Sequence, residues 1–278
     1  MSDTPASSSH IPWHPAFFQA IQLELEQYRD VLEFQSDYRL TSEPLEIDVV
    51  IIKKAPEVTI QKNIARIFKR INLLEYKSPE DYFSLYDFYK VLGYVCLYAA
   101  LNKTVLEEMT LSIVETRHPR ELFKYFEERK GHRVRETSAG IYVVSGYPVS
   151  IQIIESKRLS LSENLWLTGL NNDLNSAAAS IILKESRKKG KGAGLDAYIY
   201  AFLSANVKTL LEVVRMANGE LTLEDVLEKA GLVAKWEKRG EARGEKRGEA
   251  RGWEKAVELV KQGYTAEQLE RMSPGGSL

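Results

Sequence analysis

The stretch "INLLEYKSP", residues 71–79, decides the fold because it combines a buried strand with two charges. Ile71 and Leu73 belong to an apolar run that predicts a buried strand. Glu75 and Lys77 follow two residues apart, and in a strand such residues point to the same face. An unpaired charge costs several kcal/mol to bury. The sequence therefore requires something that neutralises these two side chains together.

The segments around this strand predict a layered α/β fold. "PLEIDVVII", residues 44–52, is rich in β-branched residues, opens with a proline as a strand start allows, and carries Asp48 in its middle. The pattern then predicts a helix over 82–101, a strand over 107–116, a helix over 119–129, and a hairpin with a further strand over 133–156, turning at Ala139-Gly140 and at Gly146. Alternating strands and helices of this kind are typical of a sheet covered by helices.

The segment before the first strand predicts a helix from His14 to about Phe34. Its apolar residues recur at steps of three and four: Phe17, Ile21, Leu25, Tyr28 and Leu32. Glu24 lies on this apolar face. Its carboxylate either points inward or reaches water at the edge of the helix, and position alone favours neither.

The chain divides by pattern into four segments. Residues 1–13 predict a disordered lead-in, 14–158 the α/β domain, 159–234 an all-helical extension interrupted at 188–194, and 235–278 a charged tail. The glycine-rich break "KKGKGAG" follows a helix rather than a strand, so it does not fit a phosphate-binding loop.

The tail carries glycines every four residues, at Gly240, Gly244, Gly248 and Gly252. They predict a helix with a small-residue stripe, marginal alone because each glycine costs up to about 1 kcal/mol relative to alanine. Such a helix fits an oligomerisation segment, a nucleic-acid-facing arm or a linker. The first is favoured, which predicts a homo-oligomer formed through this repeat.

Composition limits the class of protein. No apolar run approaches the roughly 18 residues of a membrane span, so no membrane is predicted. The single cysteine, Cys96, excludes an intramolecular disulfide and makes the cytoplasm the default compartment. A net charge of −1 gives no global preference for nucleic acid, but local basic grooves remain possible. Six cations that either line such a groove or form a solvated surface lie between the two central strands: Lys53, Lys54, Lys62, Arg66, Lys69 and Arg70.

Asp48 and Glu75 form the candidate chemical centre. If their strands pair, the two carboxylates lie side by side and repel each other unless a cation or a proton sits between them. Oxygen ligands without cysteine or histidine favour Mg²⁺ or Mn²⁺. The alternative is a buried ion pair in which Lys77 neutralises one acid. Oxygens of Glu24, Asp48 and Glu75 within about 5 Å of one point would favour the cation, whereas carboxylates that point apart would argue against it.

The order of an acid and then Glu-x-Lys on consecutive strands, behind a helix that carries Glu24, resembles the PD-(D/E)xK nuclease superfamily. "EPLEIDVVIIKK", "INLLEYKSPEDYFSLYDFYKVLGYVCLY" and "RGEARGEKRGEARG" are similar to its Rpn-type, transposase-related branch, the recombination-promoting nucleases. The likeness covers residues 14–102 and the repeat tail. One departure is that Pro44 lies four residues before Asp48, so the literal Pro-Asp pair is absent.

The resemblance implies a restriction-endonuclease-like fold and a metal-dependent DNA endonuclease linked to recombination or mobile elements. It implies that Asp48 and Glu75 bind Mg²⁺ or Mn²⁺ with the carbonyl of Tyr76, and that Lys77 orients the attacking water and offsets charge on the phosphate.

In the same family pattern, Glu24 completes the metal shell and Lys90, in the word "DFYKV", is a candidate phosphate contact. The alternative function is that of a catalytically silent nuclease-fold protein acting as a binding or assembly module.

Overall fold

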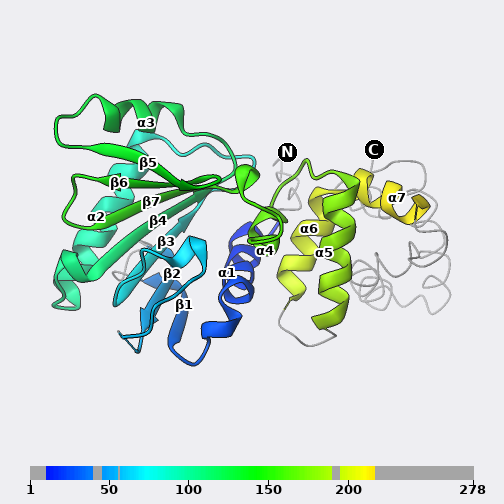
Figure 1. Ribbon diagram of the computed structural model, residues 1–278, viewed down its shortest axis with the longest axis horizontal. Helices are drawn as coiled ribbons and strands as arrows, with labels where there is room; N and C mark the ends of the chain where they lie inside the picture. Colours follow the sequence, from blue (N-terminus) through cyan, green and yellow to red (C-terminus); the bar gives the residue numbers. More distant parts are fainter. Residues whose placement is uncertain (1–10, 40–45, 56, 190–194, 217–278) are drawn as a thin grey trace, which may run out of the picture. The chain divides into compact units, whose positions relative to one another are not determined.

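The computed structural model describes residues 11–39, 46–55, 57–189 and 195–216 (Figure 1). The chain forms two compact units, Phe17–Asn171 and a second unit of Met1–Ala16 with Asn172–Leu278. The predicted lead-in, apart from its last residues, and the predicted tail over 235–278 lie outside the described residues.

The unit Phe17–Asn171 is built on one seven-stranded mixed sheet, which confirms the α/β class. Its strands are β1 (Leu32–Arg39), β2 (Glu46–Lys53), β3 (Ile71–Tyr76), β4 (Met109–Glu115), β5 (Arg133–Ser138), β6 (Ile141–Ser145) and β7 (Ser150–Glu155). They lie in the order β1-β2-β3-β4-β7-β6-β5. β3, β4 and β7 are parallel neighbours, while β1, β2 and β3 pair antiparallel on one side and β7, β6 and β5 on the other.

Helices cover both faces of this sheet (Figure 1). The helices of this part are α1 (Trp13–Glu24), α2 (Leu85–Leu101), α3 (Arg120–Glu127) and α4 (Leu165–Thr168). Phe17 of α1 stacks on Tyr76 with ring centroids 4.6 Å apart. Phe88 of α2 belongs to the same buried cluster as Leu73. Because Leu73 and Tyr76 differ by an odd number of residues in one strand, they point to opposite faces. α1 and α2 therefore cover opposite faces of β3.

The predicted long first helix is wrong in its second half. α1 ends at Glu24, a short 3₁₀ turn follows at Glu26–Tyr28, and Leu32 begins β1. "LEFQ", residues 32–35, alternates apolar and polar residues with the period of two that is typical of a strand, so Leu32 fits a strand as well as it fits the helical repeat. Pairing decides between them, because Leu32 lies opposite Lys53 and the segment satisfies its backbone along β2.

The predicted hairpin and its turns are confirmed. Gly140, between β5 and β6, has a φ of 72°, and Gly146, between β6 and β7, has a φ of 110°. A Cβ at Gly140 would come 2.7 Å from the carbonyl oxygen of Glu155. Glycine is required there both for its backbone conformation and for this close approach.

The second unit is helical over the described residues that follow Asn171. It contains α5 (Ser176–Lys189), α6 (Asp196–Ala205) and α7 (Val207–Met216), as expected of the helical extension as far as it is described. The glycine-rich segment 190–194 lies outside the described residues. Among those described, no single helix is both long and apolar enough to cross a bilayer, although Ala197–Ala205 and Val207–Arg215, bent by 86°, have the length and composition when taken together.

Candidate active site

Asp48 and Glu75 meet where the ladder between β2 and β3 ends. The register pairs Val49 with Leu74, so the next step places Asp48 opposite Glu75. In place of a further backbone bond, the N–H of Tyr76 donates to Oδ2 of Asp48 at 2.8 Å. Because the N–H and C=O of one strand residue point to the same neighbour, the carbonyl of Tyr76 also faces β2. The sequence analysis made the meeting of the two acids conditional on this pairing, and the structure shows the pairing.

The sheet presents four carboxylates at one end of one face. Asp48, Glu75, Glu115 and Glu155, here called the carboxylate row, stand on the adjacent strands β2, β3, β4 and β7. In β3, β4 and β7 the acid comes two residues after a member of the buried cluster beneath α2, and in β2 it comes two residues before one. Each acid therefore points to the same face as that cluster. Lys77, just after β3, belongs to the same face. The row thus borders the face that α2 covers, and α1 lies on the other.

Glu75 is buried without full compensation. Its residue is 7% exposed, and Oε2 has no hydrogen-bond partner. Burial raises the pKa of Glu75 to about 8, and the charge of Asp48 adds to the increase while those of Lys90 and Lys77 oppose it. A carboxylate that is buried, crowded by another acid and left with a bare oxygen favours a bound proton or cation.

Lys77 is held by the start of α2. Its Nζ lies 3.1 Å from Oδ1 of Asp87. Oδ2 of Asp87 accepts from both the N–H and the hydroxyl of Ser84, which completes the capping box of α2. Burial acts to raise the pKa of Asp87, but the bonds from Ser84 and Lys77 outweigh it, so this pKa lies below its ordinary range. Helix capping therefore fixes the position of the lysine ammonium.

Glu115 is the most deeply buried member of the row, at 1% exposed. Neither of its carboxylate oxygens makes a hydrogen bond of acceptable geometry. Burial raises the pKa of Glu115 to about 8, with the backbone N–H of Phe83 and the charge of Lys77 opposing and the charge of Glu155 adding. Glu155 stands opposite Glu115 in the register and is better compensated, because Nδ1 of His118 lies 2.8 Å from its Oε2.

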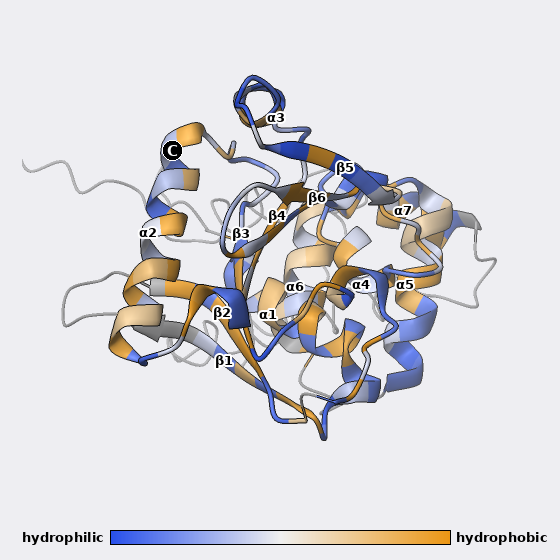
Figure 2. Cartoon of the chain, turned by 60° about the vertical axis from the view of Figure 1, so that its left-hand side comes forward, coloured by the Kyte–Doolittle hydropathy of each residue, from blue (hydrophilic) through white to orange (hydrophobic). Residues whose placement is uncertain are grey.

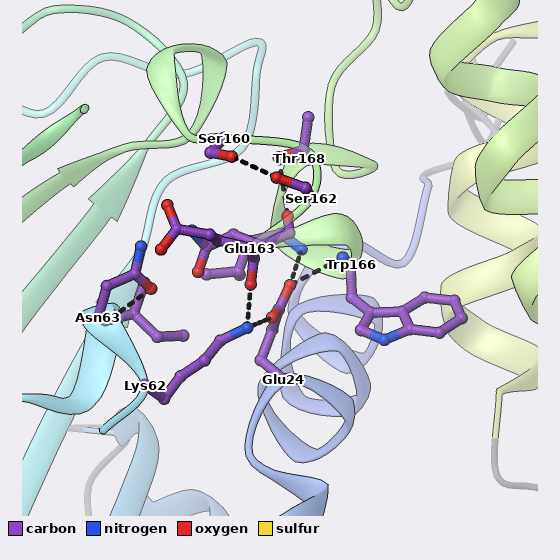
Figure 3. A network of polar contacts seen from close by, with 11 residues as sticks. Glu24, Lys62, Asn63, Ser160, Ser162, Glu163, Trp166 and Thr168 are labelled. Carbon is purple, nitrogen blue, oxygen red and sulfur yellow. Dashed lines mark hydrogen bonds and ion pairs between the residues drawn. The ribbon is translucent and has the colours of Figure 1, made fainter. Parts of the chain in front are cut away.

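Glu24 belongs to a separate network. Its Oε1 accepts from the N–H groups of Trp166 and Leu167, at 2.8 and 3.1 Å, at the start of α4, and its other oxygen pairs with Lys62 (Figure 3). Lys62 also donates to the carbonyl of Glu163. Burial raises the pKa of Glu24, and the charge of Lys62 opposes this. Because α1 covers the opposite face, the structure does not bring Glu24 to Asp48 and Glu75.

Three of the six cations between the two central strands form ion pairs with carboxylates, which leaves them less available to bind phosphate along a groove. Lys62 pairs with Glu24, Lys54 with Glu33, and Arg70 with Glu108. Lys90 of α2 is exposed, and its ammonium lies 5.6 Å from the ring centroid of Tyr94. Its charge acts on Glu75. Of the site residues that the sequence singled out, Lys90 is thus an exposed cation whose charge reaches the carboxylate row.

The expected convergence of Glu24, Asp48 and Glu75 is not found, because Glu24 belongs to the network at the start of α4. Within the described ranges, no three His, Cys, Asp or Glu side chains converge in a way that could hold a metal ion. Mg²⁺ commonly uses only one or two carboxylates, with water and substrate phosphates completing its shell. Asp48, the bare oxygen of Glu75 and the inward carbonyl of Tyr76 fit that pattern.

Sequence reasoning missed Asp87 and Glu115, although each had a signal. Asp87 stands three residues after Ser84 at the start of a predicted helix, the spacing of a capping box. Glu115 continues the alternation of Met109, Leu111 and Ile113, which places it on their face.

Comparisons with protein-family models, with curated proteins and with solved structures give no match to this chain.

Proposed function

We propose that this protein is a metal-dependent endonuclease that hydrolyses phosphodiester bonds of DNA, with its centre at Asp48, Glu75 and Lys77. The observation that carries the proposal is the bare, buried oxygen of Glu75 beside Asp48, at the opening between β2 and β3. The sequence resemblance to the Rpn-type branch supports DNA as the substrate and a role in recombination or mobile elements.

Each residue has a role set by its surroundings. Asp48 and Glu75 would hold Mg²⁺ or Mn²⁺, with the carbonyl of Tyr76 beside them. Bound there, a divalent cation lowers the pKa of water and neutralises charge on the scissile phosphate. Lys77, fixed by Asp87, places a positive charge next to the carboxylates, where it orients water and offsets phosphate charge. Lys90, exposed and with its charge acting on Glu75, would contact a neighbouring phosphate.

Nicking and linearisation of supercoiled plasmid test the proposal. The wild type is expected to cleave with Mg²⁺ or Mn²⁺ and to stop in EDTA. Asp48→Asn keeps an acceptor for the N–H of Tyr76 but removes the charge, and Lys77→Met removes the ammonium. Each is expected to lower the rate by at least about 100-fold, the size typical of losing a group that acts on transition-state charge.

Lys54→Ala is the matched control, because Lys54 is an exposed lysine paired with Glu33 on the surface. It should cleave like the wild type. Cleavage that persists in EDTA or in Asp48→Asn would contradict the proposal. A folded wild type that leaves every DNA intact would favour the alternative of a binding or assembly module.

Asp87 gives a second prediction, which separates positioning from capping. Asp87→Ala loses the capping box and should lower the free energy of unfolding by about 1 kcal/mol. Asp87→Asn keeps one side-chain oxygen, which can accept from Ser84 as Oδ2 does, and should stay close to wild-type stability. Both remove the anion that holds Lys77, so plasmid cleavage should fall about tenfold in each. Asp81→Asn, on an exposed neighbour bonded to Ser78, is the control. Full activity in Asp87→Asn would show that the ion pair does not position Lys77.

A further inference from the structure

Three tyrosines and an arginine form a continuous strip from the start of α2 to the end of α3. The rings of Tyr86 and Tyr89, both on α2, have centroids 6.4 Å apart, and Tyr89 meets Tyr125 of α3 at 5.9 Å. The hydroxyls of Tyr89 and Tyr125 lie 3.1 Å apart. The guanidinium carbon of Arg129, two residues after α3, lies 4.2 Å from the centroid of the Tyr125 ring. These four residues are here called the aromatic strip.

The aromatic strip is open to solvent. Tyr86 is 80% exposed and Tyr89 is 43% exposed. Arg129 is also exposed, and Tyr125 is half-buried. Figure 2 shows hydrophobic colouring along α2, whereas α3 is mainly hydrophilic. Exposed rings that contact one another mark an interaction site more strongly than hydrophobic residues scattered singly over a surface.

Cations flank these rings. Lys90 stands four residues after Tyr86, a spacing that makes the two side chains neighbours on the surface of α2. Arg129 lies against Tyr125 at the other end of the strip. A partner that fits the strip must therefore offer flat apolar faces to the rings and negative charge to the cations.

The acids near the strip do not cancel this charge. Glu128, next to Arg129, has its Oε1 3.7 Å from the ammonium of Lys124. Glu121, one turn before Tyr125, is exposed and makes no ion pair within the described part of the chain. Lys90 and Arg129 together outweigh this one acid, so the surface of the strip carries a net positive charge.

The strip begins beside the proposed catalytic centre. Tyr86 directly precedes Asp87, whose Oδ1 lies 3.1 Å from the ammonium of Lys77. The charge of Lys90 opposes the rise in the pKa of Glu75. A nucleic-acid strand with a phosphate between these two lysines would thus have the strip beside its neighbouring nucleotides.

We propose that the aromatic strip binds a single-stranded segment of DNA next to the scissile phosphate, with bases stacked on Tyr86, on Tyr89 and on the guanidinium of Arg129. Rings that stack on any base, combined with cations along the backbone, are the means by which proteins hold single strands without sequence preference. In a duplex, the faces of the bases are already stacked on their neighbours and cannot reach the rings. Supercoiled plasmid supplies such a segment, because negative supercoiling favours local strand separation.

The inference rests on the proposed function for the position of the cleaved bond, and it names a single strand as the form of DNA that the centre takes. Binding is measured apart from cleavage, by fluorescence anisotropy of labelled oligothymidine of about 20 nucleotides, longer than typical single-strand sites. The full-length protein is used in EDTA, where metal-dependent cleavage does not run.

Tyr86→Ala is expected to raise the Kd for oligothymidine at least about fivefold, the loss of one stacked base. Tyr86→Phe keeps the ring and should bind like the wild type. Leu101→Ala is the matched control, because Leu101 is a 59% exposed apolar residue at the other end of α2, outside the strip. It should leave the Kd unchanged.

The salt dependence separates stacking from phosphate contact. Lys90→Met should lower the slope of log Kd against log salt concentration by about 0.7, the value for one phosphate on a single strand. Tyr86→Ala should leave that slope unchanged, and it should also leave binding of a duplex of equal length unchanged. An equal loss for duplex and single strand in Tyr86→Ala would overturn the proposal.

A wild type that does not bind oligothymidine, or an unchanged Kd in Tyr86→Ala, would also overturn it. Tighter binding of oligouridine would overturn the choice of DNA. A wild-type dimer that becomes monomeric in Tyr86→Ala by light scattering would assign the strip to a protein interface instead. Binding that depends on Tyr86 would support the strip even if plasmid stayed intact, whereas plasmid cleavage without such binding would overturn the strip and leave the nuclease proposal standing.

Discussion

The Glu115→Gln variant is expected to unfold about 6 to 12 °C above the wild type at pH 8 in EDTA, and at nearly the wild-type temperature at pH 4.5. Glu115 is 1% exposed, and its pKa of about 8 lies far above the ordinary value near 4.3. The carboxyl therefore holds its proton more tightly in the folded chain than in the unfolded chain. Its contribution to stability is fully present below about pH 4 and is lost as the pH rises to about 8.

The size of this effect follows from the shift. A difference of more than three pKa units corresponds to between about 3 and 5 kcal/mol of lost stability at pH 8. Glutamine stays neutral and avoids that loss. Its buried amide would lack some hydrogen-bond partners there, which offsets part of the benefit, so we expect the free energy of unfolding to rise by about 3 kcal/mol at pH 8. Thermal unfolding across pH 4.5–8 measures the effect, with Glu121→Gln as the control, because Glu121 is an exposed residue of α3. Parallel curves for wild type and Glu115→Gln would contradict it.

The Lys62→Ala variant is expected to lose between about 3 and 5 kcal/mol of unfolding free energy. Lys62 is the cation paired with Glu24, whose side chain is 2% exposed. Removing one partner leaves a buried carboxylate that only the N–H groups at the start of α4 compensate. Urea unfolding at pH 7 measures the loss through the shift in midpoint at constant slope.

The double variant Glu24→Gln/Lys62→Met should recover most of that stability, because it removes both charges and keeps similar volume. Lys54→Ala is the surface counterpart, since both members of its pair with Glu33 are about half exposed, and it should change stability by less than about 1 kcal/mol. Equal effects of Lys62→Ala and Lys54→Ala would show that the buried pair contributes no more than an exposed one.

Local pattern predicted the elements that form the centre. The β-branched run around Asp48 and the apolar run before Glu75 became β2 and β3, and the helical repeat over 82–101 became α2. The approach of Asp48 to Glu75 followed from one assumption, that these two strands pair. Alternation within a strand then fixed the common face of Glu75 and Lys77.

What the sequence could not settle depends on tertiary partners. A helical repeat places Glu24 on the apolar side of its helix, but it shows neither whether the carboxylate points inward nor which face of the sheet the helix covers. The carboxylate of Glu24 meets Trp166, 142 residues along the chain, and no local pattern links the two. By spacing alone Leu32 fits both a helix and a strand. It belongs to a strand because its segment pairs with β2.

The hydrogen bond between the Tyr76 amide and Asp48 makes one backbone proton a reporter of the centre. Neighbouring strand amides donate to carbonyl groups that do not titrate, whereas this one donates to a carboxylate. In a ¹⁵N-resolved NMR spectrum, the Tyr76 cross-peak should therefore move with the ionisation of Asp48 and with any cation that binds there. Cation binding at the centre would then be readable in the intact protein, without substrate and without a label on the side chain.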